Sequence, residues 1–85
     1  MSPRFAYLYF MKDDPDHVRA AAPDHVSHWH RLRLDGYLGG PFEDRSGGLI
    51  IFESADDEAQ TAVESDPFVR SELLERYWLK QWMPQ

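Results

Sequence analysis

The strand-like segments of this sequence carry apolar side chains at both odd and even positions. Successive side chains of a β-strand point to opposite faces of its sheet, so a strand with one wet face alternates apolar and polar residues. The segment Arg4–Met11 instead has Phe5, Tyr7 and Tyr9 on one face and Ala6, Leu8 and Phe10 on the other. Apolar residues also occupy both parities in Leu49–Phe52 and in Tyr77–Met83. A sheet made of these strands must bury both of its faces.

The order of the segments predicts a known arrangement. Strands are expected at Arg4–Met11, Tyr37–Phe42, Leu49–Phe52 and Tyr77–Met83, and helices at Ala20–Leu34 and Asp56–Glu64. This βαββαβ order predicts an α+β, ferredoxin-like fold with a four-stranded antiparallel sheet. Two helices can cover one face of such a sheet. We expect a second copy of the chain to cover the other face, which predicts a homodimer; the alternative is that loops fold over it.

Composition limits the remaining possibilities. The chain has 85 residues, which predicts a single domain over 1–85 whose own core is marginal in size. It contains no cysteine, so disulfides are excluded, and this fits a reducing, cytoplasmic location. The net charge of −6 argues against nucleic-acid binding, and no apolar run has the length of a membrane span.

Local signals predict where the elements begin and end. Pro23 suits the first turn of the first helix, and Gly36 is expected to end that helix. Residues 16–20 fit either a short turn or an extension of the helix. Ser54 is expected to cap the second helix, and the stretch Val69–Glu75 has room for a further helical turn.

Histidines are the first candidates for chemistry, because an imidazole exchanges protons near neutral pH. His25 and His28 are three residues apart on one helical face, a spacing that also suits a Zn²⁺ or Cu²⁺ site completed by a carboxylate such as Asp24. His25 is expected near the helix start, where the helix dipole favours a neutral base. Asp66 is a candidate partner for it. A surface histidine and a capping aspartate are the alternative.

Two further groups are candidates for contact with a ligand. Gly39, Gly40 and Pro41 form either a bend in a strand or a place where the backbone approaches a ligand closely. The hydroxyls of Tyr7 and Tyr9 can donate hydrogen bonds if they lie at a cavity wall.

Taken in order, several short motifs resemble the YciI-like (YCII-related) family. They are Pro23-Asp24-His25-Val26, Asp35-Gly36, Gly39-Gly40-Pro41, Gly47-Gly48-Leu49-Ile50-Ile51 and Asp66-Pro67-Phe68-Val69. The resemblance covers nearly the whole chain and implies a dimeric α+β barrel, related to muconolactone isomerase. Members often continue as Asp-Pro-Phe-x-x-x-Gly, whereas this chain has Ser71-Glu72 in that stretch and no glycine.

The resemblance also implies a function. His25 and Asp66 match the family's proposed catalytic pair, and the family includes a dehydrochlorinase of a chlorinated hydroxyquinol. We therefore expect a cofactor-free enzyme without a metal that transfers protons in an isomerisation or elimination of a small organic substrate. Tyr7, Gly39, Gly40 and Pro41 are expected to contact that substrate. The alternative is a dimeric module that binds a small metabolite without turning it over.

Overall fold

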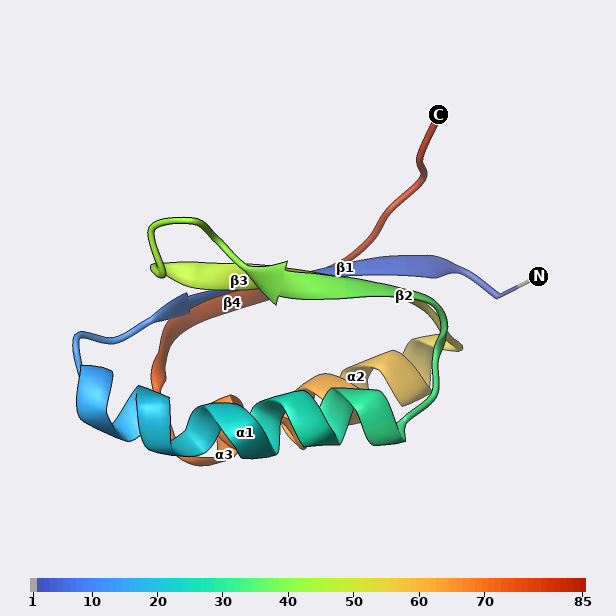
Figure 1. Ribbon diagram of the computed structural model, residues 1–85. Coiled ribbons are helices and arrows are strands. Elements are labelled where there is room, and N and C mark those ends of the chain that lie inside the picture. The colour runs from blue at the N-terminus through green and yellow to red at the C-terminus, as the bar shows by residue number, and fades with distance from the viewer. Residues whose placement is uncertain (1) are drawn as a thin grey trace.

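The computed structural model describes residues 2–85 as an antiparallel sheet with a layer of helices beneath it (Figure 1). The elements are β1 (Arg4–Met11), α1 (Pro15–Arg31), β2 (Asp35–Pro41), β3 (Gly47–Glu53), α2 (Asp56–Glu64), α3 (Pro67–Arg70) and β4 (Leu74–Gln81). The four strands lie in the order β2-β3-β1-β4, and each pairs antiparallel with its neighbours. This confirms the predicted ferredoxin-like α+β fold.

The core lies between the sheet and the helices. In the central strand β1, Phe5, Tyr7 and Tyr9 are buried, and their cross-strand partners on β3 are Phe52, Ile50 and Gly48. The helices add buried side chains from the opposite layer, namely Trp29, Ala59, Ala62, Val63 and Phe68. The odd positions of β1 therefore face the helices, as the strand period requires.

The first helix differs from the prediction at both ends. It begins at Pro15 rather than Ala20, so Pro15, not Pro23, occupies the first turn. Pro23 lies inside the helix, where it cannot donate to the carbonyl one turn earlier. Gly36 does not end the helix either: Leu32 is the cap, and Gly36 lies at the start of β2 with φ of 63°. That left-handed angle explains the glycine, because other residues adopt it at a cost.

The second half of the chain contains two further differences. Ala55, not Ser54, precedes α2, and the Ser54 hydroxyl donates to the carbonyl of Ala55 instead of capping the helix. The short helix α3 begins at Pro67, two residues before the stretch Val69–Glu75 that has room for a helical turn, and its cap is Asp66. As a result β4 begins at Leu74 and ends at Gln81, earlier than the predicted Tyr77–Met83.

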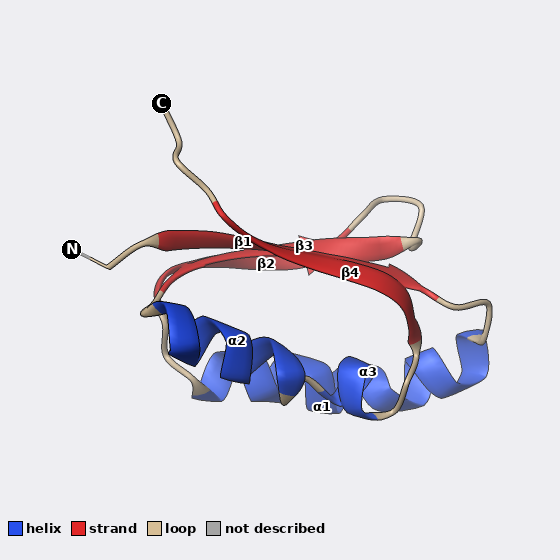
Figure 2. Cartoon of the chain, turned by 180° about the vertical axis from the view of Figure 1, so that it is seen from behind, coloured by secondary structure: helices blue, strands red, loops and turns tan. Residues whose placement is uncertain are grey.

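The other face of the sheet carries no helix in either view (Figures 1 and 2). Its side chains come from the even positions of β1 and from their partners in the register, including Leu8, Leu49, Ile51 and Trp78. Leu38, on the edge strand β2, is 71% exposed, and Trp78, on β4, is 43% exposed. We call this the outer face. It is the second apolar face that strands with apolar residues at both odd and even positions predict. No helix within residues 2–85 is long and apolar enough to cross a membrane.

Candidate active site

His25 and Asp66, which are 41 residues apart in sequence, meet between the helices and the sheet. His25 comes from α1 and Asp66 directly precedes α3. The Nδ1 atom of His25 lies 2.8 Å from Oδ1 and 3.0 Å from Oδ2 of Asp66. Both residues are buried. The two residues predicted as a pair are therefore within hydrogen-bond distance of each other.

Asp66 is completely buried and is held by several donors besides His25. Its Oδ1 accepts from the backbone N–H of Phe68 at 2.9 Å, and its Oδ2 accepts from the Tyr7 hydroxyl and the Trp29 indole, each at 3.1 Å. Burial alone would raise the pKa of Asp66, but the hydrogen bond and charge of His25, with the Phe68 and Trp29 donors, lower it overall. Asp66 is thus an ionised carboxylate that uses both oxygens as acceptors.

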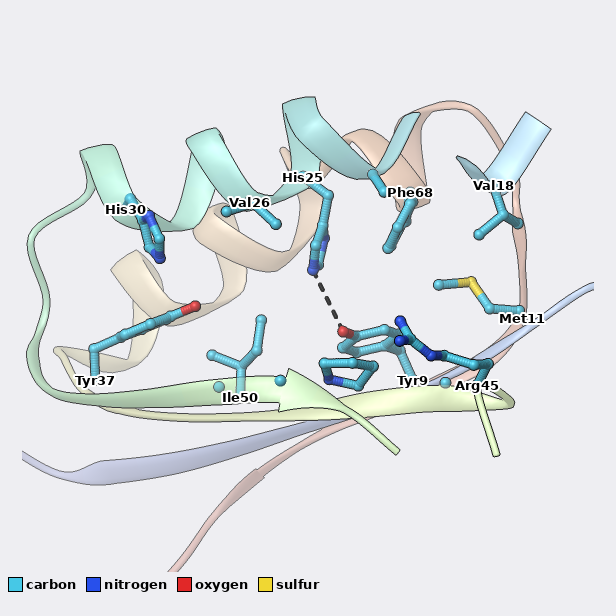
Figure 3. A pocket seen from close by; sticks show the side chains of 15 residues that line it. Tyr9, Met11, Val18, His25, Val26, His30, Tyr37, Arg45, Ile50 and Phe68 are labelled. Atoms are coloured by element: carbon cyan, nitrogen blue, oxygen red, sulfur yellow. Dashed lines mark hydrogen bonds between the residues drawn. The ribbon is translucent and has the colours of Figure 1, made fainter. Parts of the chain in front are cut away.

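This carboxylate determines which nitrogen of His25 carries a proton. An ionised Asp66 only accepts, so Nδ1 of His25 must be the protonated nitrogen that donates to it. In the neutral ring Nε2 then has a free lone pair. Figure 3 shows the ring pointing from α1 towards the sheet, with Nε2 facing the Tyr9 hydroxyl at 3.4 Å. Phe68 stacks against the ring with centroids 4.1 Å apart, which holds its orientation.

Tyr9 is the hydroxyl that faces this nitrogen, and Gly48 makes room for it. Gly48 is the partner of Tyr9 on β3, and a Cβ atom added there would lie 2.2 Å from the Tyr9 hydroxyl oxygen. Burial, followed by the charge of Asp66, raises the pKa of Tyr9 to about 12. Tyr9 is therefore a neutral phenol that can donate to Nε2.

A cavity of about 410 Å³ adjoins Tyr9 and His25 (Figure 3). Gly39, Gly40 and Pro41 line it, as their proposed contact with a ligand requires. Its other walls include Tyr37, Phe68, His30 and Arg45. A volume of this size suits a small organic molecule.

Tyr7 does not line the cavity, although it is predicted to contact a ligand. Its side chain is completely buried, its hydroxyl donates to Asp66, and it is not among the residues that line the cavity. Burial and then the charge of Asp66 raise the pKa of Tyr7, which keeps it a hydrogen-bond donor. The placement gives Tyr7 a part in holding Asp66, while Tyr9, on the same face of β1, lines the cavity and faces His25.

One expectation about the histidines is corrected by the structure. His25 lies in the interior of α1, because the helix starts ten residues earlier at Pro15, so the dipole of a helix start does not act on it. His28 points away from His25 and does not form a metal site with it, because the Nε2 of His28 donates to the backbone carbonyl of Ala62 at 2.8 Å. Within residues 2–85, no group of three or more histidine, cysteine or acidic side chains is arranged to hold a metal ion.

The sequence interpretation did not identify Arg45, His30 or Tyr37 as neighbours of His25. They come from the β2–β3 loop, the end of α1 and β2, and only the packing of α1 on the sheet brings them to one cavity. One signal was available for Tyr9: a strand glycine opposite an aromatic residue often marks close packing over the missing side chain.

Comparison with known proteins places the chain in context. The family model of the YCII-related domain matches residues 5–83. A solved structure with a TM-score of 0.79 is 5-chloro-2-hydroxyhydroquinone dehydrochlorinase from Burkholderia phenoliruptrix AC1100, in complex with 2,5-dihydroxybenzoquinone; it is 20% identical, and the match covers 94% of this chain and 93% of that one. A dimeric ferredoxin-like protein of unknown function from Thermobifida fusca YX has a TM-score of 0.57 at 15% identity, with 96% and 90% of the two chains covered. No curated protein matches the sequence significantly.

Proposed function

Because this chain belongs to the YCII-related domain family, we propose that it is a small-molecule enzyme in which His25 transfers a proton and Asp66 positions His25. One observation carries the proposal. Asp66 holds Nδ1 of His25 at 2.8 Å, which leaves Nε2 directed at the Tyr9 hydroxyl beside the cavity. A general base needs such a lone pair within hydrogen-bond reach of a bound substrate.

The geometry supports the following proton path. A substrate hydroxyl or acidic C–H takes the place of the Tyr9 hydroxyl at Nε2 and gives up its proton there. The imidazolium that forms is stabilised by the ionised Asp66, which stays ionised because its pKa is lowered. If the proton returns to another atom of the substrate, the result is an isomerisation. If a leaving group departs with its bonding electrons, the result is an elimination.

An elimination on a hydroxylated ring is the first reaction to test. The structurally similar enzyme from Burkholderia phenoliruptrix is named for the dehydrochlorination of 5-chloro-2-hydroxyhydroquinone. In that reaction class one proton is removed and chloride leaves with the C–Cl electron pair, so HCl is lost and no oxidant is consumed. Nε2 of His25 is the proposed acceptor of the proton here.

The experiment is chloride release from 5-chloro-2-hydroxyhydroquinone, together with deuterium uptake from D₂O into hydroxyquinols. We expect His25→Ala to lower kcat by about 10²–10⁴-fold, the usual contribution of general acid–base catalysis. His17→Ala is the control, because His17 is an exposed histidine of the same helix. Turnover by His25→Ala at the wild-type rate would end the proposal. Binding of these compounds without turnover by the wild type would favour the metabolite-binding alternative.

The role of Asp66 has a readout that does not depend on turnover. In Asp66→Asn the amide can donate to Nδ1, so the neutral ring should shift its proton to Nε2 and lose the lone pair that faces the cavity. The ¹⁵N chemical shifts of His25 distinguish the two tautomers. We expect the Nδ1-protonated form in the wild type and the Nε2-protonated form in Asp66→Asn. The same tautomer in both proteins would contradict a positioning role.

We further propose that the chain acts as a homodimer through the outer face of its sheet. The support is the apolar surface formed by Leu8, Leu49, Ile51, Leu38 and Trp78. These residues lie on the face of the sheet that the helix layer leaves uncovered (Figure 2). Exposed apolar patches of this kind usually mark an interface. The Thermobifida fusca protein of similar fold is described as dimeric.

A further inference from the structure

The charge of the cavity is opposite to that of the chain. The sequence has fifteen acidic and nine basic residues, yet no aspartate or glutamate is among the residues that line the cavity. The lining contains one permanent cation, Arg45, and two histidines, His25 and His30. A cavity lined by one permanent cation and by no carboxylate favours negatively charged ligands, even in an acidic protein.

The β2–β3 loop presents Arg45 to this cavity. Arg45 has φ of 64°, and its backbone N–H donates to the carbonyl of Phe42 at 3.0 Å, which closes the turn that carries it. The neighbouring carboxylate is engaged elsewhere, because Oδ1 of Asp44 accepts from the N–H and the hydroxyl of Ser46 at 3.0 and 2.6 Å. Figure 3 shows the guanidinium on the same side of the cavity as Tyr9. Within residues 2–85 it makes no ion pair, since the pairs formed involve other residues.

The remaining walls suit a flat molecule. Tyr9, Tyr37, Phe68 and the His25 ring present aromatic surface, and the Gly39–Pro41 backbone presents no large side chain. A planar guanidinium binds a carboxylate or an enolate oxygen through two parallel N–H donors, which also fixes the plane of the ligand.

We propose that the site takes a small planar anion, with a negatively charged oxygen on Arg45 and the exchanged proton at Nε2 of His25. This inference rests on the proposed function and names its substrate class. Arg45 would also act during the reaction. When Nε2 removes a proton, the bound anion gains a second negative charge while the imidazole becomes an imidazolium, and the nearby guanidinium of Arg45 stabilises the dianion.

The test compares salicylate with salicylamide, a flat anion and its neutral counterpart, by isothermal titration calorimetry at pH 7. We expect the wild type to bind salicylate at least about tenfold more tightly, as a charged hydrogen bond implies. Arg45→Gln should remove this preference and leave the affinity for salicylamide within about twofold. Arg33→Gln is the matched control, because Arg33 is likewise exposed with a positive φ of 49° but does not line the cavity. It should bind like the wild type.

The result separates this inference from the proposed function. Titrating His25→Gln measures the preference for the anion without the proton acceptor, and we expect the preference to persist. If the wild type prefers the anion but turns over none of the test substrates, the inference stands and the enzyme proposal is removed. Equal binding of the two probes by the wild type, no binding of either probe, or an unchanged preference in Arg45→Gln would overturn the inference.

Discussion

At Gly48 the space that a methyl group would need is occupied by the Tyr9 hydroxyl. A Cβ atom at Gly48 would lie 2.2 Å from that oxygen, whereas a Cβ atom at Gly40 would meet nothing within 4 Å. We expect Gly48→Ala to lower the free energy of unfolding by about 1–3 kcal/mol, because Tyr9 must move away from His25. Gly40→Ala is the control and should change stability by less than about 0.5 kcal/mol. Urea unfolding measures both, and equal losses would contradict this packing.

The lowered pKa of Asp66 predicts how the free energy of unfolding changes with pH in the acid range. Burial raises its pKa, but the hydrogen bond and charge of His25, together with the Phe68 and Trp29 donors, lower it overall in the folded protein. The unfolded chain therefore takes up the proton of this carboxylate at the higher pH. The resulting stabilisation is complete above the unfolded carboxyl pKa of about 3.9 and is lost as pH falls through the lower folded value.

We therefore expect the free energy of unfolding of the wild type to fall over this acid range more steeply than that of Asp66→Asn. Urea unfolding at pH steps between about 5 and 2 measures the difference. Asp24→Asn, which changes an exposed aspartate of α1, should keep the wild-type slope. A wild-type slope in Asp66→Asn would show that the buried carboxylate is not the group responsible.

At the scale of elements, the link between α3 and β4 contains a residue in a costly conformation. Glu72 has φ of 55°, in the left-handed region, at the position where related chains are expected to have the glycine of Asp-Pro-Phe-x-x-x-Gly. The turn therefore keeps the backbone of a glycine although the glycine is absent, and Asp66 still caps α3.

Glu72→Gly should raise the free energy of unfolding by up to about 1 kcal/mol. A non-glycine residue in the left-handed region costs roughly 1–2 kcal/mol, and the larger conformational entropy that glycine loses on folding offsets part of the gain. Thermal and urea unfolding measure the change. Ser71→Gly is the matched control, since Ser71 has an ordinary φ of −90° and should be destabilised by the substitution. A loss of stability in Glu72→Gly would show that the glutamate side chain contributes more than its backbone costs.

For the whole molecule, the proposed dimer depends on the outer face. Trp78→Glu and Leu38→Glu place a charge on this face, and we expect each to raise the dimer dissociation constant by at least about 100-fold, because a charge buried at an apolar interface is costly. Leu32→Glu is the control, as Leu32 is 40% exposed on the helix side of the chain. Sedimentation velocity at micromolar concentration measures the effect. A wild-type monomer under these conditions would contradict the proposed dimer.

Several features of this protein follow from local sequence alone. The bounds of β1 at Arg4–Met11 and of α2 at Asp56–Glu64 are confirmed residue by residue, because a run dense in aromatic and aliphatic residues and an acidic first turn are properties of short windows. The two-sided apolar pattern of the strands likewise indicated a bare sheet face, since side-chain direction in a strand depends only on parity. The pairing of His25 with Asp66 came from a family resemblance, which the spacing of the residues did not itself supply.

Tertiary packing decided what lies around that pair. The parity of β1 places Tyr7 and Tyr9 on one face but cannot say which hydroxyl meets Asp66 and which meets His25; the positions of α1, α3 and Gly48 against the sheet determine that. The same packing carries Arg45 to the cavity and turns His28 towards Ala62. Local sequence limits the direction of each side chain along its own element, whereas contacts between distant residues depend on how whole elements fit together.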